Sequence, residues 1–196
     1  LGMNSRLALV AAVFHMINHA TFKASLFMAA GIVDHETGTR DLKRLSGLGH
    51  AMPVTATVAL VAAAAMAGVP LLNGFLSKEM FFAETTALGD GLSGFALPLA
   101  ATIAAVFSVA YSARFVHDTF FNGEPVDLPK TPHEPPRFMR VPVELLVLLC
   151  LAVGVAPALT VGPLLAVGAQ AALGAELPEY SLALWHGFNL PLAMSV

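Results

Sequence analysis

The chain has 196 residues, of which 57% are hydrophobic and only 12% are charged. Soluble domains carry about a quarter charged residues, so this composition excludes an ordinary soluble domain and predicts an integral membrane protein. The formal net charge of −3, without a run of basic residues, gives no reason to expect nucleic acid as a partner, and the single Cys150 excludes an internal disulfide.

The first predicted membrane span covers residues 7–33, an apolar run interrupted only by His15, Asn18, His19 and Lys23. At a rise of about 1.5 Å per residue, a helix of this length crosses about 30 Å of hydrocarbon with some tilt. A polar loop follows at residues 34–50.

The central stretch, residues 54–88, predicts an apolar helix, a break and a second helix that carries Lys78. Pro70 lacks a backbone N–H and Gly74 relaxes the backbone, so we expect the break at residues 70–75. A charge at mid-membrane costs about 3 kcal/mol, and broken helices survive there only when they are buried in protein or line a watery cavity. Lys78 beside the break therefore indicates an ion path. The alternative is a lysine that snorkels to the membrane interface.

The third predicted span covers residues 95–121, where Tyr111 and nearby phenylalanines suit an interfacial aromatic belt. A Pro-rich, hydrophilic connector occupies residues 122–140, and its prolines favour an extended surface loop. An additional helix is expected at about residues 141–160. After it, an extracytoplasmic segment is expected, which includes the apolar but short stretch 162–174. The chain to residue 196 then contains the start of a further predicted helix.

The distribution of basic residues predicts the topology. Both the 34–50 loop and the 122–140 connector contain lysines and arginines, whereas the turn near residue 90 and the segment after residue 160 contain none. Two crossings separate the basic loops, so both fall on the same face, which the positive-inside rule assigns to the cytoplasm. The terminal apolar run at 182–196 is too short to span a bilayer, and we expect an internal piece of a larger membrane protein.

His15, His19 and Lys23 recur every four residues and therefore share one face of the first span over about 12 Å. Protonatable groups in a line through a membrane are what a proton relay requires, and histidine titrates near neutral pH. The alternatives are interhelical hydrogen bonds, or a metal or haem site, for which no further ligands lie nearby in the sequence. We expect no cofactor. Glu79 points about 100° away from Lys78 in a helix, so a charge partner for Lys78 is expected on another helix.

Two long motifs, HMINHATFKASLFMAAG at 15–31 and GVPLLNGFLSKEMFF at 68–82, resemble the antiporter-like family shared by Mrp-type multisubunit cation/proton antiporters and respiratory complex I. The stretches GIVDHETGTRDLKRLSGL and LWHGFN are similar to the A-type subunit of the Mrp antiporters. The resemblance extends over essentially the whole chain.

This resemblance implies an all-α polytopic membrane protein, part of an antiporter-like helix bundle with one discontinuous transmembrane helix. Residues 1–121 would end the second of two inverted repeats. Lys78 would match the lysine of the second broken helix, and His15, His19 and Lys23 the polar row beside it. The implied protein is a secondary transporter subunit without enzymatic chemistry, in a bacterial cell membrane, which exchanges protons for Na⁺ or a similar monovalent cation together with other subunits.

Two other functions remain open from the sequence. One is a proton-pumping, antiporter-like subunit of NADH:quinone oxidoreductase, which shares the same lysine and histidine rows. The other is a structural membrane subunit whose polar residues only fix helix packing. No glycine-rich phosphate loop or iron–sulfur motif is present in the sequence.

Overall fold

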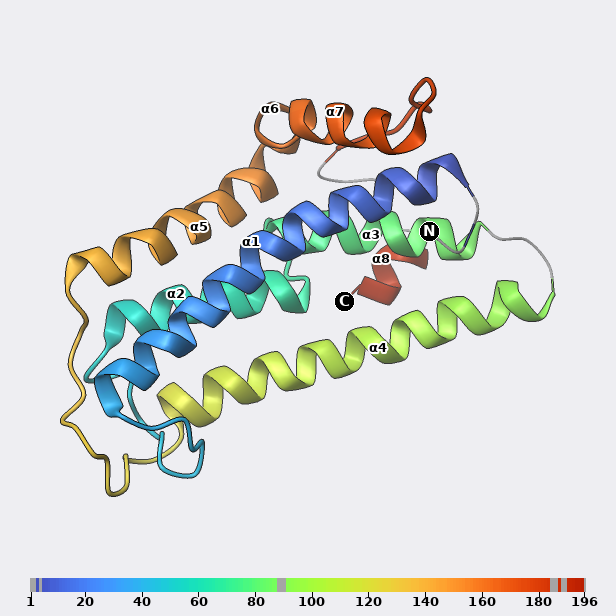
Figure 1. The fold of residues 1–196 in the computed structure, drawn as a ribbon. Coiled ribbons are helices and arrows are strands. Elements are labelled where there is room, and N and C mark those ends of the chain that lie inside the picture. The colour runs from blue at the N-terminus through green and yellow to red at the C-terminus, as the bar shows by residue number, and fades with distance from the viewer. Residues whose placement is uncertain (1–2, 4, 88–90, 184–186, 188–189, 196) are drawn as a thin grey trace.

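The computed structural model describes residues 3, 5–87, 91–183, 187 and 190–195, and these residues are helical or irregular throughout (Figure 1). Among these described residues, three helical segments are long and apolar enough to cross a membrane: Arg6–Thr37, Gly94–Phe121 and Arg137–Val155. The elements in chain order are α1 (Arg6–Thr37), α2 (Pro53–Ala67), α3 (Asn73–Thr86), α4 (Leu92–Val116), η1 (His117–Phe121), α5 (Arg137–Val155), α6 (Pro157–Thr160), α7 (Gly162–Leu173) and α8 (Leu190–Ser195).

Helix α1 is the centre of the fold, because α2, α3, α5 and α7 all pack against it (Figure 1). It begins after Ser5, whose hydroxyl accepts a hydrogen bond from the backbone N–H of Ala8 at 3.0 Å. It ends at Gly38, whose φ of 74° lets its N–H reach the carbonyl of Asp34. Residues 34–37, expected in the following loop, are therefore the last turn of α1.

The helix break lies between Ala67, the end of α2, and Asn73, the start of α3. Pro70 is in this break, but Gly74 is not, since it occupies the first turn of α3. The glycine that turns the chain is Gly68, with a φ of 91° that favours glycine. Gly74 serves close packing instead, because a Cβ atom there would overlap the carbonyl oxygen of Ala65.

Helix α4 packs against α2 and α3, and its outer surface is apolar and exposed. It continues into the π-helical turn η1, after which the connector runs back across the ends of α1 and α2 (Figure 1). The exposed apolar surface of α4 is suited to contact with lipid or with further helices. The large exposed hydrophobic residues of α4 include Phe95, Ile103, Val106 and Phe107.

The C-terminal third differs in its boundaries from the predicted spans. Helix α5 begins at Arg137, within the expected connector, and ends at Val155 because Pro157 starts the separate turn α6. The short apolar stretch 162–174 forms α7, which packs on α1. Helix α8 lies beside α3. The LWHGFN motif at 184–189, apart from Gly187, and the predicted end of the second span at residue 88 lie outside the described residues.

Replacing Gly74 with alanine is expected to lower the thermal stability of the assembled parent protein. The new methyl group would overlap the Ala65 carbonyl and force α2 and α3 apart, at a cost of about 1–3 kcal/mol. Gly31→Ala is the matched control, since a Cβ atom there meets nothing within 4 Å. Thermal unfolding in detergent would measure both variants, and equal melting temperatures for G74A and wild type would contradict the close-packing assignment.

Candidate functional site

Lys78 lies at the broken helix and is held by the end of α2. Its Nζ atom donates a hydrogen bond of 2.7 Å to the carbonyl of Ala67, the last residue of that helix. A Cβ atom on Gly68 would come within 2.9 Å of the Lys78 side chain, so the lysine passes directly over this glycine. The last carbonyls of a helix lack helical donors and carry the negative end of the helix dipole, which suits a cation. The break thus provides a binding position for the ammonium group.

The polar row of α1 begins next to this lysine. The Nδ1 atom of His15 lies 3.3 Å from the hydroxyl of Ser77, the residue before Lys78. The ring centroids of His15 and His19 are 5.8 Å apart. His15 therefore has polar neighbours on both sides, Ser77 in α3 and His19 in α1.

Lys23, the last member of the row, faces an aromatic ring from α4. Its Nζ atom lies 5.3 Å from the ring centroid of Tyr111, within the range of a cation–π interaction. Tyr111 was expected in an interfacial belt, but its hydroxyl lies 3.2 Å from the sulfur of Met66 in α2. Ser108, one turn earlier, donates to the carbonyl of Met66 at 3.3 Å. The three-residue spacing of Ser108 and Tyr111 in an apolar span is the signal that could have predicted their shared face.

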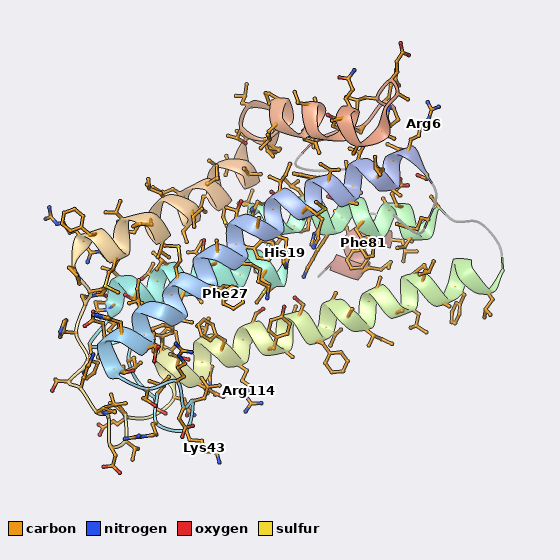
Figure 2. All side chains as sticks on the ribbon, viewed as in Figure 1. Arg6, His19, Phe27, Lys43, Phe81 and Arg114 are labelled. Carbon is orange, nitrogen blue, oxygen red and sulfur yellow. The ribbon has the colours of Figure 1, made fainter. Side chains whose placement is uncertain are left out.

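All four predicted ion-path residues line one cavity of about 500 Å³ between α1, α3 and α4. Figure 2 shows His19 and Phe81 directed toward the space between these helices, whereas Arg114 points away from it. Most of the wall is apolar, from alanine, phenylalanine and methionine side chains. The charged and titratable groups therefore share one space whose walls are mostly apolar. The predicted residues in this cavity are His15, His19, Lys23 and Lys78.

A buried pair of asparagines fixes the first helix to the start of α3. The Asn18 amide donates to the carbonyl of Asn73 at 3.0 Å, and the Asn73 amide lies 3.4 Å from the Asn18 side-chain oxygen. Both side chains are almost fully buried. This pair sets the position of the broken helix relative to the polar row.

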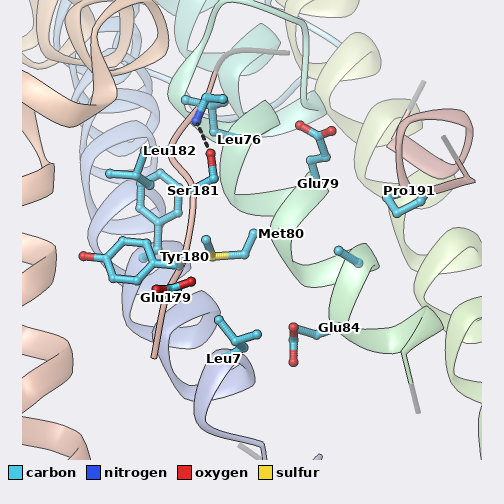
Figure 3. Close-up of a pocket in the computed structure, with 13 residues that line it drawn as sticks. Leu7, Leu76, Glu79, Met80, Glu84, Glu179, Tyr180, Ser181, Leu182 and Pro191 are labelled. Carbon is cyan, nitrogen blue, oxygen red and sulfur yellow. Dashed lines mark hydrogen bonds between the residues drawn. The ribbon is translucent and has the colours of Figure 1, made fainter. Parts of the chain in front are cut away.

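Glu79 lies in a different cavity from its neighbour Lys78, as its position on the helix predicts. A cavity of about 330 Å³ between α1, α3 and the segment around Tyr180 is lined by Glu79, Glu84 and Glu179 (Figure 3). Glu84 accepts a hydrogen bond of 2.7 Å from the hydroxyl of Ser5.

Residues 1–108 match the family described as NADH:quinone oxidoreductase/Mrp antiporter, transmembrane. The chain belongs to this family. It is 62% identical over its whole length to a probable K⁺/H⁺ antiporter subunit of the A/B type from Rhizobium meliloti, and 41% identical over 96% of its length to the A-type Na⁺/H⁺ antiporter subunit of Bacillus subtilis. In the Mrp complex of Dietzia sp., a chain with 41% identity matches 99% of this chain with a TM-score of 0.83.

The likeness also extends to a respiratory assembly. A membrane-bound sulfane sulfur reductase, described as an archaeal respiratory membrane complex, matches 76% of this chain with 29% identity and a TM-score of 0.68. The chain spans only about a fifth to a quarter of the length of these relatives. The predicted all-α membrane architecture and the resemblance to the A-type subunit of the Mrp antiporters are confirmed.

Asn18→Ala is expected to destabilise the parent protein by about 1–3 kcal/mol, because it removes the buried hydrogen bond to the Asn73 carbonyl and leaves the Asn73 amide only the Asn18 backbone carbonyl as acceptor. The measurement is the thermal stability of the purified complex. Asn122→Ala, at an exposed position after η1, is the control and is expected to unfold as wild type does. A wild-type melting temperature for N18A would exclude a structural role for the asparagine pair.

Proposed function

We propose that this chain forms part of the ion path of a monovalent cation/proton antiporter subunit. Protons pass along His15, His19 and Lys23 toward Lys78, and each change in protonation alters the charge in the shared cavity. The single observation that carries this proposal is that all four residues line that one cavity. A general principle supports the proposal: placing a titratable residue at membrane depth costs free energy, and such residues are mostly retained for transport.

The geometry supports transfer in short steps. His15 lies between Ser77, which precedes Lys78, and His19, and both neighbours are close enough for transfer directly or through one water molecule. The Lys23 ammonium group rests on the Tyr111 ring, which attracts a cation without forming a carboxylate pair that would trap it. A proton-carrying lysine needs such a weak partner, since a strongly stabilised ammonium group does not release its proton at neutral pH.

The names of the relatives support the proposed ion and partners, and the basic loops support the proposed orientation. Relatives named as K⁺/H⁺ and Na⁺/H⁺ antiporter subunits support a monovalent cation and a membrane complex with further subunits. The bacterial relatives support a position in the bacterial cell membrane. The positive-inside rule supports a cytoplasmic location for the 34–50 loop and the connector. We also propose that residues 1–121 form the end of the second of two inverted repeats.

A respiratory proton pump is the second candidate, favoured by the likeness to the archaeal respiratory complex. Such a pump translocates protons only when an electron donor is supplied, and it does not require Na⁺ or K⁺. Proton movement in vesicles that depends on Na⁺ or K⁺ and needs no electron donor would exclude this candidate.

Lys78→Ala is expected to abolish cation-induced collapse of a proton gradient in inverted vesicles containing the complete parent complex. The substitution removes the charge held at the break, and we expect a loss of at least about tenfold, since the ammonium group bound by the Ala67 carbonyl is gone. Lys43→Ala, an exposed loop lysine, is the matched control. If K78A assembles fully and still exchanges ions at the wild-type rate, Lys78 serves packing only and the alternative of a structural role holds.

Tyr111→Phe is expected to retain most exchange, whereas Tyr111→Leu is expected to reduce it severalfold. Phenylalanine keeps the ring face that attracts Lys23, and leucine removes it at a cost of about 0.5–2 kcal/mol. The rates of the two variants would be compared at matched complex levels in the same vesicle assay. Equal rates in both variants would show that the ring does not act on Lys23.

A further inference from the structure

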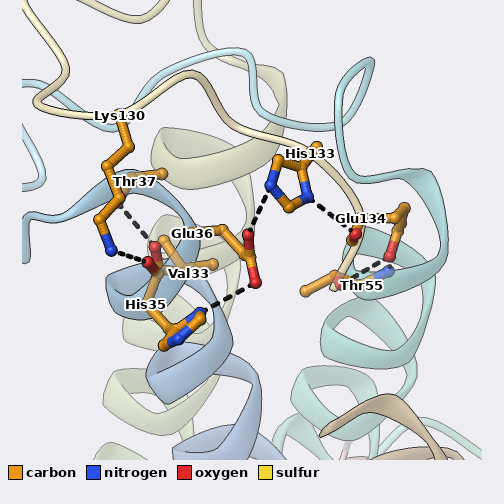
Figure 4. Close-up of polar contacts among 8 residues, drawn as sticks. All are labelled: Val33, His35, Glu36, Thr37, Thr55, Lys130, His133 and Glu134. Atoms are coloured by element: carbon orange, nitrogen blue, oxygen red, sulfur yellow. Dashed lines mark hydrogen bonds and ion pairs between the residues drawn. The ribbon is translucent and has the colours of Figure 1, made fainter. Parts of the chain in front are cut away.

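A second cluster of titratable residues lies at the other end of α1, outside the predicted membrane path (Figure 4). Glu36 has only 4% of its side chain exposed, and each of its carboxyl oxygens contacts one imidazole. Oε1 lies 2.9 Å from Nδ1 of His35, and Oε2 lies 3.2 Å from Nε2 of His133 in the connector. The cluster therefore joins residues that are far apart in the sequence.

The connector is closed onto two helices around this cluster. Lys130 donates its backbone N–H to the carbonyl of Thr37 at 3.2 Å and its Nζ to the carbonyl of His35 at 2.9 Å. Glu134 accepts hydrogen bonds from the backbone N–H groups of Val54 and Thr55, and from the Thr55 hydroxyl. These contacts cap the N-terminus of α2, where a carboxylate is favoured by the helix dipole. His133 sits between the two attachments.

The contacts of His133 determine how many protons the cluster holds. Its Nδ1 atom lies 3.0 Å from the carbonyl oxygen of Glu134, which can only accept, so Nδ1 must carry a proton. Its Nε2 atom faces Glu36 Oε2. An ionised carboxylate can only accept, so either Nε2 also carries a proton or Glu36 is protonated and donates to Nε2. In both cases the pair holds one proton more than a neutral histidine beside an ionised glutamate.

Once that proton is lost, neither position of the remaining proton on the His133 ring satisfies both of its contacts. If His133 keeps its proton on Nδ1, the lone pair of Nε2 faces the Glu36 carboxylate. If the proton moves to Nε2, the lone pair of Nδ1 faces the Glu134 carbonyl. One of the two contacts becomes repulsive, and a buried carboxylate loses a hydrogen bond, which is costly.

The charged groups around the pair come from several elements. Within α1 they are His35, on the other oxygen of Glu36, and Asp34, which pairs with Arg40 at 2.8 Å. The connector supplies Lys130 and Glu134. Helix α5 supplies Arg140, 3.9 Å from Glu134 and 2.7 Å from Glu144. Glu134 and Asp34 each have a cationic or N–H partner of their own. The shared proton is therefore held mainly by Glu36 and the two imidazoles that contact it.

We propose that Glu36 and His133 form a proton-binding site, and that the connector closes onto α1 and α2 only while this site holds its proton. Bulk water supplies the proton through the imidazoles of His35 and His133, which are 60% and 70% exposed, whereas the carboxylate between them is buried. The ligand is therefore H⁺, taken up at the loop face. This site is separate from the membrane cavity and does not rest on the proposed antiport activity.

The test is the mobility of a spin label on the connector in the complete parent complex, with other reactive cysteines replaced. Thr131→Cys places the label on an exposed residue near His133. Between about pH 5 and about pH 9, which brackets the range where histidines change charge, the wild-type label is expected to change from immobile to mobile in a single-proton transition. An invariant line shape over this range would overturn the proposal.

Substitutions of Glu36 separate proton binding from a simple packing contact. Glu36→Gln can donate to the neutral Nε2 of His133 and accept from His35, so it imitates the protonated site and is expected to keep the label immobile at every pH. Glu36→Ala removes both contacts and is expected to leave the label mobile at every pH. His50→Gln, an exposed histidine in the 34–50 loop, is the control and should retain the wild-type transition. A wild-type pH transition in E36Q would overturn the proposal, even if E36A failed to assemble.

Discussion

The hydrogen bond from Lys78 to the carbonyl of Ala67 is the interaction around which the central part of this chain is built. It exists only because α2 stops at Ala67 and leaves its last carbonyls without helical donors. In a continuous helix the same carbonyl would accept a backbone N–H, and a lysine in hydrocarbon would have no polar partner. The break therefore provides both the polar group that binds the cation and the space through which the lysine passes over Gly68.

The break itself depends on close helix packing. Leu71 adopts a φ of 68°, which costs a non-glycine residue about 1–2 kcal/mol and must be held by its surroundings. The Asn18–Asn73 pair fixes the start of α3 to α1, and Gly74 allows α3 to approach the backbone of α2. The polar row keeps its position relative to Lys78 through these contacts. Because His19 is exposed in this chain and polar groups are costly in lipid, its face is suited to packing against further helices.

The sequence predicted the membrane class, the shared face of His15, His19 and Lys23 and the presence of a break, because composition and helical spacing report directly on these features. It misplaced Gly74, since a glycine that allows close packing has the same local signature as one that turns the chain. Only the contact with Ala65 tells the two apart. The contact of Tyr111 with Met66 was not predicted, because an aromatic residue near a helix end suits a membrane interface equally well. The Glu36–His133 pair could not be predicted, since the path of the Pro-rich connector is set by tertiary contacts.

The two titratable clusters are connected through the helices that carry them. Glu36 lies about 20 Å along the axis of α1 from Lys23, so it is not a further member of the polar row. However, the connector that binds Glu36 also caps the N-terminus of α2, and the C-terminus of α2 holds Lys78. A packed helix of this length moves largely as a rigid body, since its interior is close-packed. Opening the connector would remove its bridge between the loop-face ends of α1, which carries the polar row, and α2, whose last carbonyl holds Lys78.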